Sequence, residues 1–341
     1  MREPILLTLC PLETDGTSLY RGVGPLGVLR KQIPLNIYSP QDINWATMAK
    51  SDACFMQRPF SADQLACFDA IKNNGLKVWV DYDDDLFNLS PKNCAFRVYN
   101  DPKIRNSVMW FLENADFVTV ATHKLKSEYD KYRRGKSGCV VVPNAWNDFL
   151  QGYRPTPLPL DPSPYKTIVW RGGQNNVENL EYFFEPLLAT LKDLPPEWKF
   201  IAIGDVPYEI EQAVPEDRFQ KIDFIPCCSE YLRVLYRLRP TIMVSLLKKH
   251  PFFEAKSNIC FIEGVVSGAA VMAASYMPEF QKPGVLTYDD PDDFAKKLKM
   301  LCADAEQIKI RQETSWEYIK ENLRLSRVNS LRKKILDEMM K

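Results

Sequence analysis

The sequence is short of the residues that build metal and redox sites. Its 341 residues include only two histidines, His123 and His250, and its nine cysteines form no C-x-x-C pair. Structural zinc sites need closely spaced Cys and His ligands, so no zinc site is expected. Unpaired cysteines in apolar stretches, such as Cys54 and Cys260, are typical of reduced core residues in a cytosolic protein.

The sequence also lacks a net charge and any long apolar run. Its 44 Lys and Arg residues balance 44 Asp and Glu residues, so no overall basic field indicates nucleic acid or an anionic membrane as a partner. No signal peptide opens the chain, and no apolar run approaches the length of a membrane span. We therefore expect a cytoplasmic protein with no integral membrane segment.

Strand and helix patterns alternate through both halves of the chain. A length of 341 residues exceeds one ordinary domain and suits two. Tyr153 to Pro164 contains five prolines, which make an extended, semi-stiff linker. The expected organisation is an α/β domain over residues 1–150, a linker over 151–165 and a second α/β domain over 166–320. Each domain is expected to be doubly wound and Rossmann-like, and the two should face each other across a cleft.

One unit of the second half is especially informative. Thr241–Leu247 and Ala269–Ala274 are apolar, as in buried strands, and Ile259–Ser267 between them is helix-like. Ser257 and Asn258 are good N-caps for that helix. The loop and the helix start should lie at the carboxyl edge of a parallel sheet, where open α/β proteins bind ligands.

A lysine and a glutamate flank the start of this helix. Lys256 lies at its N-terminal end, where backbone N–H groups and the helix dipole attract anions. Glu263 lies two turns later on the same face, roughly 10 Å away at about 1.5 Å per residue. This separation suits a Lys on a diphosphate and a Glu on ribose hydroxyls. The alternative is a solvated pair on an exposed helix.

In each domain, a loop that contains glycine follows the first predicted strand. In the second domain, Arg171, Gly172 and Gly173 follow a strand, and glycines let backbone N–H groups approach a phosphate. In the first domain, the loop over residues 15–26 is neither a GxGxxG fingerprint nor a P-loop. It is either a ligand-contacting loop or a turn before a helix over Leu26–Lys31.

An acidic run follows the predicted strand Lys77–Val80. Like charges this close raise one another's pKa values, so Asp81–Asp85 is costly unless something uses it. The run either binds a divalent metal, orients acceptor hydroxyls or acts as a base, or caps the next element. Asp83 and Asp84 are the favoured functional members, and a metal is the least favoured explanation.

The segment from Lys92 to Lys136 has a local excess of positive charge. It contains ten Lys or Arg residues against five Asp or Glu residues. Such a patch suits a polyanionic acceptor, although an ordinary solvated surface is the more common explanation.

A series of short motifs surrounds Lys256. They are Pro251-Phe252-Phe253, Ala255-Lys256-Ser257-Asn258, Glu263, Gly268 and Val271-Met272-Ala273-Ala274-Ser275. Together they resemble the donor site of two-domain, family-4-like glycosyltransferases of the GT-B fold. Eight residues separate Glu254 from Glu263, whereas the commoner family form has seven, so Glu263 is the expected ribose ligand.

The resemblance implies a retaining glycosyltransferase with a nucleotide-sugar donor, UDP- or another NDP-sugar, and no required cofactor or metal. It implies that Arg171 and Lys256 hold the diphosphate and that Lys256 stabilises the departing phosphate. The stretch after Ile222–Ile225 would cradle the base, with Phe224, Ile225 and Tyr231 as candidates, although core packing is the favoured role for Phe224. The other implied donor-side residues are Gly172, Gly173, Ser257, Asn258 and Glu263.

The resemblance also implies the acceptor side. Asp83, Asp84 and Lys256 are the catalytic candidates, and the acceptor would enter near Gly16, Thr17, Ser18, Arg21 and Asp85. In GT-B folds a C-terminal helix crosses back to the first domain. Ala305–Met340 is predicted to be one long helix, and residues 321–341 are expected to make that contact.

The acceptor has several candidates. Chains with the "DYDDDLF" loop and the "KSN" motif look like glycosyltransferases of large tailed bacteriophages, and such an enzyme would work in the host cytoplasm. The favoured acceptor is a hydroxymethylated pyrimidine in double-stranded DNA, and the alternative is a surface polysaccharide or a lipid-linked sugar. From another class, a non-catalytic two-domain protein that closes on a small ligand remains an alternative.

Overall fold

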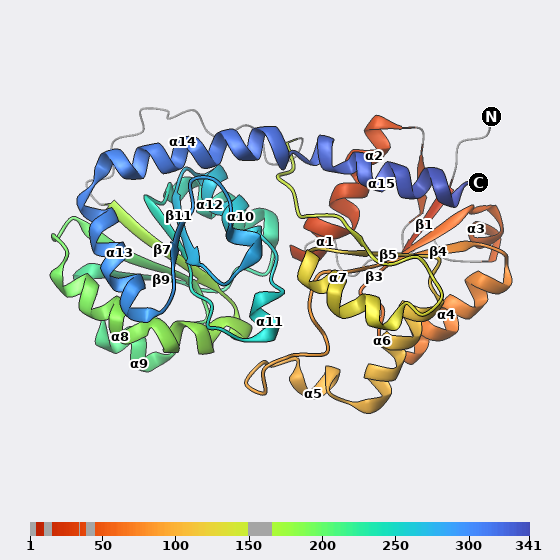
Figure 1. Cartoon of the computed structure of the whole chain (residues 1–341), viewed down its shortest axis with the longest axis horizontal. Helices are drawn as coiled ribbons and strands as arrows, with labels where there is room; N and C mark the ends of the chain where they lie inside the picture. The colour runs from red at the N-terminus through yellow and green to blue at the C-terminus, as the bar shows by residue number, and fades with distance from the viewer. Residues whose placement is uncertain (1–4, 10–15, 34, 39–44, 149–165) are drawn as a thin grey trace.

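The computed structural model describes residues 5–9, 16–33, 35–38, 45–148 and 166–341. The proline-rich segment lies outside these residues. The described parts form two α/β halves that lie side by side (Figure 1). Within them, each half contains one parallel six-stranded sheet. The predicted α/β class with two Rossmann-like halves is confirmed.

The first sheet has the strand order β2-β1-β3-β4-β5-β6. Its strands are β1 (Ile5–Leu9), β2 (Asn36–Tyr38), β3 (Ala53–Gln57), β4 (Lys77–Tyr82), β5 (Phe117–Val120) and β6 (Val140–Val141). Its helices are α1 (Gly16–Arg21), α2 (Val23–Gln32), α3 (Trp45–Lys50), α4 (Ala62–Asn73), α5 (Phe96–Tyr99), α6 (Pro102–Asn114) and α7 (His123–Tyr129), followed by a 3-10 turn, η2 (Asp130–Tyr132). All residues of β3 are buried, as expected for a parallel sheet covered on both faces.

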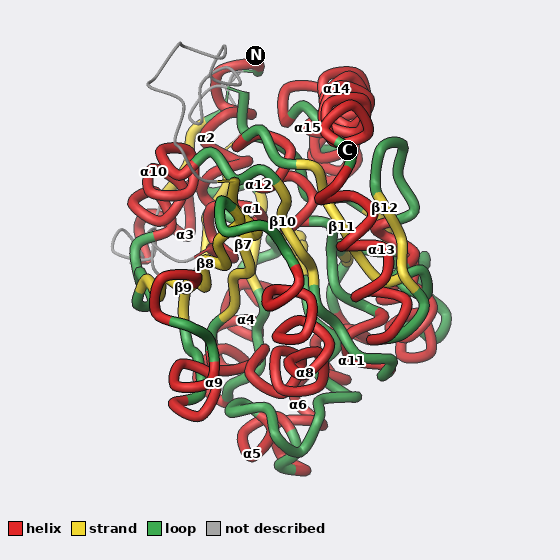
Figure 2. The backbone as a smooth tube through the Cα atoms, turned by 90° about the vertical axis from the view of Figure 1, so that its left-hand side faces the viewer, coloured by secondary structure: helices red, strands yellow, loops and turns green. Residues whose placement is uncertain are grey.

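The second sheet has the order β12-β11-β10-β7-β8-β9, and Figure 2 shows these strands side by side between helices. Its strands are β7 (Lys166–Gly172), β8 (Trp198–Gly204), β9 (Phe219–Ile222), β10 (Ile242–Ser245), β11 (Ala270–Ala274) and β12 (Leu286–Tyr288). Its helices are α8 (Val177–Asp193), α9 (Tyr208–Ala213), α10 (Cys228–Leu238), α11 (Pro251–Glu254), α12 (Ile259–Ser267), α13 (Pro291–Ala303) and α14 (Ala305–Asn322). Three 3-10 turns complete this half: η3 (Gln174–Asn176), η4 (Glu216–Arg218) and η5 (Pro278–Phe280).

The predicted unit around Lys256 is present as β10, α12 and β11. Gly268 ends α12 in the left-handed conformation, with φ 99°. Gly264 lets the helix lie close to the sheet, because a Cβ there would be 2.9 Å from a Val271 side-chain atom. The start of α12 is thereby fixed at the carboxyl edge of β10 and β11.

The long C-terminal helix is interrupted, which corrects the prediction of one helix over Ala305–Met340. The backbone N–H of Trp146 donates to the carbonyl of Leu323, and the N–H of Leu325 donates to the carbonyl of Trp146, each at 2.8 Å. These bonds replace the helical ones at this point. A separate helix, α15 (Leu325–Met339), then packs on α2 of the first half (Figure 1).

Residues 16–26 are helical apart from a bend at Gly22, which corrects the expectation of a loop or turn there; residue 15 lies outside the described residues. Gly16–Arg21 forms α1, and Gly24 lies inside α2. A Cβ at Gly24 would lie 2.1 Å from the carbonyl oxygen of Leu19. That glycine therefore permits the close approach of two helices rather than of a ligand.

Candidate functional site

Two adjoining cavities lie where the two halves face each other. The first, of about 290 Å³, is lined by Gly16, Thr17, Tyr20, Arg171, Gly172, Gly173, Ile203, Gly204, Phe224, Ile225, Pro226, Cys228, Tyr231, Ile259 and Glu263. The second, of about 360 Å³, is lined by Thr17, Arg58, Asp83, Asp84, Trp170, Arg171, Asn175, Asn176, Ser245, Leu246, Leu247, Lys256, Ser257, Ile259, Cys260 and Phe280. The two share Thr17, Arg171 and Ile259, so they form one continuous site at the carboxyl ends of the strands.

Glu263 lies at the first cavity with both carboxylate oxygens hydrogen-bonded. Tyr20 donates its hydroxyl to Oε1 at 3.1 Å, and Tyr231 donates to Oε2 at 2.9 Å. Nη2 of Arg171 forms an ion pair with Oε2 at 3.0 Å. Because Glu263 is only 3% exposed, the alternative of a solvated glutamate on an open helix is excluded.

The two tyrosines reinforce this arrangement from different halves of the molecule. Burial and the adjacent Glu263 carboxylate raise the pKa of Tyr20 and of Tyr231 well above the usual value. Both therefore stay protonated and act as hydrogen-bond donors. Tyr20 comes from α1, so Glu263 is contacted across the boundary between the halves.

The glycine loop after β7 forms one wall of the first cavity. The carbonyl of Gly172 accepts a bond from the N–H of Asp205 at 3.0 Å. Gly204 has φ 116°, and a Cβ there would be 2.0 Å from that same carbonyl. The strand ends thus approach so closely that only glycine fits.

Phe224 differs from the core position expected for it. Its side chain is 57% exposed and lines the first cavity beside Gly173, Ile225 and Tyr231. The residue comes just after β9, which ends at Ile222, so the chain has already left the sheet. The mostly apolar run over Ile222–Ile225 does not distinguish this position from a strand residue.

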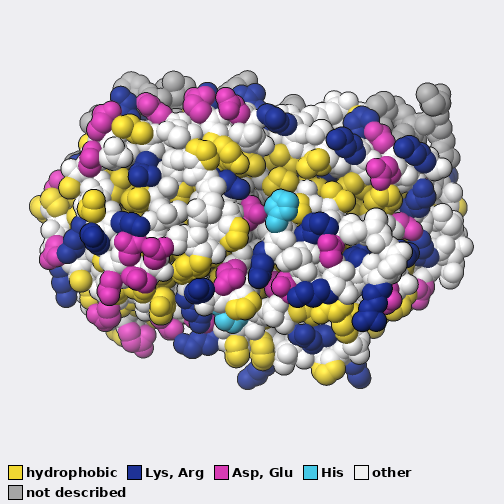
Figure 3. All heavy atoms as spheres, in the orientation of Figure 1, with side chains coloured by type: hydrophobic (Ala, Val, Ile, Leu, Met, Phe, Trp, Pro, Cys, Tyr) yellow, Lys and Arg dark blue, Asp and Glu magenta, His cyan; other side chains and the backbone are white. Residues whose placement is uncertain are grey.

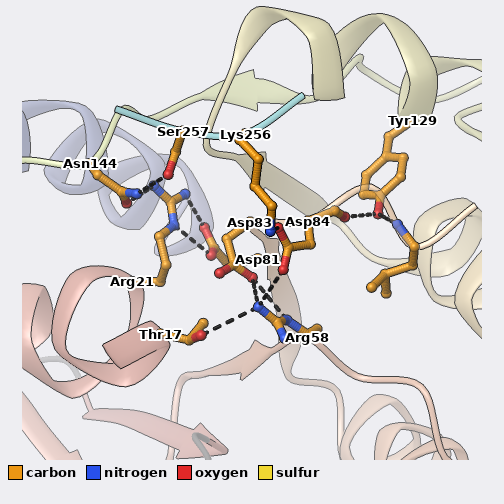
Figure 4. A network of polar contacts seen from close by, with 11 residues as sticks. Thr17, Arg21, Arg58, Asp81, Asp83, Asp84, Tyr129, Asn144, Lys256 and Ser257 are labelled. Carbon is orange, nitrogen blue, oxygen red and sulfur yellow. Dashed lines mark hydrogen bonds and ion pairs between the residues drawn. The ribbon is translucent and has the colours of Figure 1, made fainter. Parts of the chain in front are cut away.

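Lys256 points across the second cavity toward the first half (Figure 4). Its Nζ lies 2.8 Å from Oδ1 of Asp84 and 4.3 Å from the centre of the Phe252 ring. Burial alone would raise the pKa of Asp84, but Lys256 and Arg58 hold it below its usual value. Lys256 and Asp84, predicted from separate motifs, are therefore brought into contact.

Arg58 completes this network and was missed in the sequence analysis. It follows β3, and its guanidinium contacts Asp83, Asp84 and Thr17. Burial raises the pKa of Asp83, and Arg58 opposes that rise. Arg58 immediately follows β3, which pairs with β4, and β4 leads into Asp83. This position after a buried strand was the signal that could have identified Arg58 as a site residue.

Arg21 and Asp85, like Ser18, were expected on the acceptor side but line neither cavity. Arg21 is 1% exposed and donates to both carboxylate oxygens of Asp81, at 2.9 and 2.6 Å, and to Asn144. Strand β4 continues to Tyr82, which places Asp81 inside the sheet. Asp85 is fully buried, accepting bonds from the Phe87 N–H and the Asn88 amide, and burial raises its pKa. Arg21 and Asp85 are therefore parts of the buried interior rather than of the cavity walls.

The remaining predicted residues lie around the same edge. Gly16 and Thr17 line the cavities, whereas Ser18 is fully buried. Ser257 accepts a bond from the amide of Asn144, at 2.9 Å, and thereby connects the two halves. Asn258 occupies the N-cap position of α12, but its side chain makes no capping bond.

The basic segment over residues 92–136 is used within the fold only in part, since six of its ten Lys and Arg residues are exposed. Arg133 is buried and donates to the carbonyls of Leu112 and Ala115 at the end of α6. Lys126 pairs with Asp130 along α7. In the view of Figure 3, Lys and Arg side chains are interspersed with Asp and Glu over both halves.

Over the described ranges, no three or more His, Cys, Asp or Glu residues gather where they could hold a metal ion. In the same ranges, no helix is both long and apolar enough to cross a membrane.

No protein-family model and no curated protein sequence matches this chain. Several solved structures are similar to it. Sucrose-phosphate synthase from Thermosynechococcus elongatus is similar with a TM-score of 0.67 and 13% identity over 99% of each chain. HepE of Anabaena in complex with UDP-glucose is similar with a TM-score of 0.65 and 14% identity, over 98% of this chain and 99% of that one.

A third similar structure is an alpha-glucosyltransferase in complex with UDP-glucose and DNA containing an abasic site. Its TM-score is 0.59, with 11% identity over 99% of each chain. At these identities the similarity establishes the fold. The chain has the GT-B fold, as the resemblance around Lys256 implied.

Proposed function

We propose that this chain is a glycosyltransferase that moves a sugar from a UDP-sugar or another nucleotide-sugar to an acceptor hydroxyl. One observation carries the proposal. Lys256, Arg171 and Glu263 line two continuous cavities at the carboxyl edge of a GT-B fold. The similar structures with bound UDP-glucose support the choice of donor.

The first cavity would take the nucleoside. Glu263 would accept a hydrogen bond from a ribose hydroxyl through Oε1, which has a second lone pair beyond its bond from Tyr20, whereas Oε2 is already contacted by Tyr231 and Arg171. Ile225, Phe224 and Tyr231 would border the base. Gly172 and Gly173 would let backbone groups approach the diphosphate.

The second cavity would take the diphosphate and the sugar. Lys256 and Arg171 would hold the diphosphate, with Ser257 beside it; Asn258, at the N-cap of α12, is buried and lines neither cavity. As the bond from the anomeric carbon to the phosphate oxygen breaks, its electron pair stays on the nucleoside diphosphate. Lys256 and Arg171 would stabilise that developing charge.

The acceptor would enter from the side of Thr17, Asp83 and Asp84. Its hydroxyl oxygen forms the new bond to the anomeric carbon, and its proton passes to a carboxylate there and then to water. Retention of the anomeric configuration is part of the proposal and rests on the family-4-like motifs. NMR of the product's anomeric carbon would test it.

The acceptor that we propose is a hydroxymethylated pyrimidine in double-stranded DNA. The similar alpha-glucosyltransferase that binds both UDP-glucose and DNA supports this choice. Within the basic segment, Lys126 pairs with Asp130 and Arg133 is buried, so these two add little to the positive charge that would face DNA. The enzyme would work in the cytoplasm, which is the host cytoplasm if a bacteriophage encodes the chain.

The test is a transfer assay with a panel of nucleotide-sugars. Duplex DNA with hydroxymethylated pyrimidines and unmodified duplex DNA are offered in parallel, and mass spectrometry of the nucleosides detects the sugar. A gain of a hexose or pentose mass only on the hydroxymethylated base would establish donor class and acceptor together.

Two other outcomes revise the proposal. Slow hydrolysis of a nucleotide-sugar without transfer to DNA would keep the enzyme class and move the acceptor to a polysaccharide or lipid-linked sugar. Binding of a small ligand with neither transfer nor hydrolysis would favour a non-catalytic binding protein.

A further inference from the structure

Arg58 has a backbone conformation that arginine rarely adopts. It is left-handed, with φ 46°, immediately after β3. Its N–H donates to the carbonyl of Asp81 at 2.8 Å, which continues the pairing of β3 with β4 for one more residue. A non-glycine residue in this region costs of order 1–3 kcal/mol, and such strain gathers at functional sites. A glycine would fit the backbone better, so the arginine side chain needs an explanation.

The side chain of Arg58 is directed at the acidic loop (Figure 4). Nε donates to Oδ1 of Asp83 at 2.9 Å, and Nη2 contacts the same oxygen. Nη2 also reaches Oδ2 of Asp84 at 3.4 Å and Thr17 at 3.3 Å. The guanidinium is 25% exposed and lines the second cavity, so this network faces the space for a substrate.

Asp83 and Asp84 differ in how many of their carboxylate oxygens are contacted by the described residues. Asp84 has both oxygens in use, since Oδ1 contacts Lys256 and Oδ2 contacts Arg58. Both Arg58 contacts to Asp83 go to Oδ1, and no hydrogen bond from the described residues reaches its Oδ2. Asp83 therefore has one anchored oxygen and one oxygen available to a ligand in the cavity.

We propose that Arg58 is a positioning residue that holds Asp83 so that its second carboxylate oxygen receives the acceptor hydroxyl. The inference rests on the proposed glycosyltransferase function. In the transfer step, the acceptor oxygen bonds to the anomeric carbon on the face from which the phosphate leaves, so that the configuration is retained, and its proton passes to Oδ2 of Asp83. The bond to the phosphate breaks, its electron pair leaves with the nucleoside diphosphate, and Asp83 returns the proton to water.

The charges around Asp83 predict how Arg58 affects its ionisation. Arg58 at the end of β3, Asp84 in the same loop and Arg21 from α1 act on it directly. Tyr99 of α5 faces Arg58, and Lys256 of the other half faces Asp84. Burial raises the pKa of Asp83 and Arg58 opposes the rise, so removing Arg58 moves that pKa up. Because Asp83 acts as the ionised base, the acid limb of the activity profile then shifts to higher pH.

The experiment compares Arg58→Gly with a matched control, Arg239→Gly. Arg239 is the other described non-glycine residue with a positive φ, 47°, and lies at the C-cap of α10 away from both cavities. Glycine relieves the backbone strain at either position, which offsets part of the loss of the side-chain contacts, and thermal melts show that each variant is folded at the assay temperature. The assays are cleavage of UDP-glucose and transfer to the acceptor identified as above, each as a function of pH.

For Arg58→Gly we expect kcat to fall by roughly 100-fold, the donor KM to change by less than about threefold, and the acid limb to rise by about one pH unit or more. Arg58→Lys should restore most of the limb position, because it restores the positive charge. Arg239→Gly should match wild type in all three readouts.

Wild-type kcat in Arg58→Gly, or a lower kcat with an unmoved acid limb, would overturn the role of Arg58. Failure of the proposed function is distinguishable, since wild type itself would then cleave no nucleotide-sugar.

Discussion

Two arginine–aspartate pairs lie at the same strand, and their surroundings give them different tasks. Asp81 lies inside β4 and Asp83 lies just beyond its end. The Arg21–Asp81 pair is closed off from water, with side chains 0% and 2% exposed. The Arg58–Asp83 pair is 25% and 13% exposed and lines the second cavity.

The difference shows that access, rather than residue type, separates a structural ion pair from a candidate catalytic one. Every described contact of the Arg21 guanidinium is to Asp81, Val142 or Asn144, and no substrate atom can reach it. A buried pair of this kind costs a protein heavily when one partner is lost, because the other charge stays buried and unpaired. The open pair, by contrast, can lose a partner to solvent or to substrate.

The largest effect is expected from Asp81→Asn. The variant keeps the shape of the side chain but leaves Arg21 without its counter-ion, at a cost of about 3–5 kcal/mol in unfolding free energy. Chemical denaturation followed by circular dichroism measures it. The matched control is Asp69→Asn on the exposed face of α4, which should stay within about 0.5 kcal/mol of wild type. Equal stability of the two variants would contradict the structural role of the closed pair.

The next effect belongs to the open network. Lys256→Ala should lower kcat/KM for the nucleotide-sugar by roughly 10²–10³-fold, because the group that we propose stabilises the leaving phosphate is lost. Its melting temperature should stay near that of wild type, since Lys256 is partly exposed. Lys249→Ala is the control: this lysine is exposed in the same connection between β10 and α12, and the variant should transfer sugar normally. Normal activity of Lys256→Ala would remove the assignment of the donor site.

Asp83→Asn tests the open pair directly against the closed one. We expect turnover to fall by roughly 100-fold, because the amide cannot take the acceptor proton. Donor affinity, measured by calorimetry with UDP, and the unfolding free energy should both change little. If Asp83→Asn unfolds as readily as Asp81→Asn, the two pairs do not differ in the way proposed. If turnover is unchanged, the acidic loop serves only to cap the chain.

The sequence predicted one side of the site better than the other, for a physical reason. Lys256 and Glu263 lie on one helix unit, whose geometry follows from local spacing. Arg21 and Arg58 are the same residue type, so residue type does not tell which of them is buried. The pairing of β3 with β4 and the helical form of α1 decide that. Those features depend on contacts between residues that are far apart in the sequence. The contact of Tyr20 with Glu263 spans 243 residues of sequence, so no local pattern could have predicted it.

The smallest effect concerns Asp84, which connects the open pair to Lys256 across the cleft. Because Lys256 and Arg58 depress the pKa of Asp84 in the folded protein, the ionised carboxylate stabilises the fold above the unfolded value of about 3.9. That contribution is lost as pH falls through the lower folded value. Asp84→Asn should therefore be about 1 kcal/mol less stable than wild type at pH 7, a modest figure because the pair is partly solvated. The difference between the two should shrink below about pH 4, as followed by thermal melts from pH 7 to pH 2. A difference that stays constant to pH 2 would mean that the Asp84 carboxylate, unlike Asp81, contributes nothing through its charge.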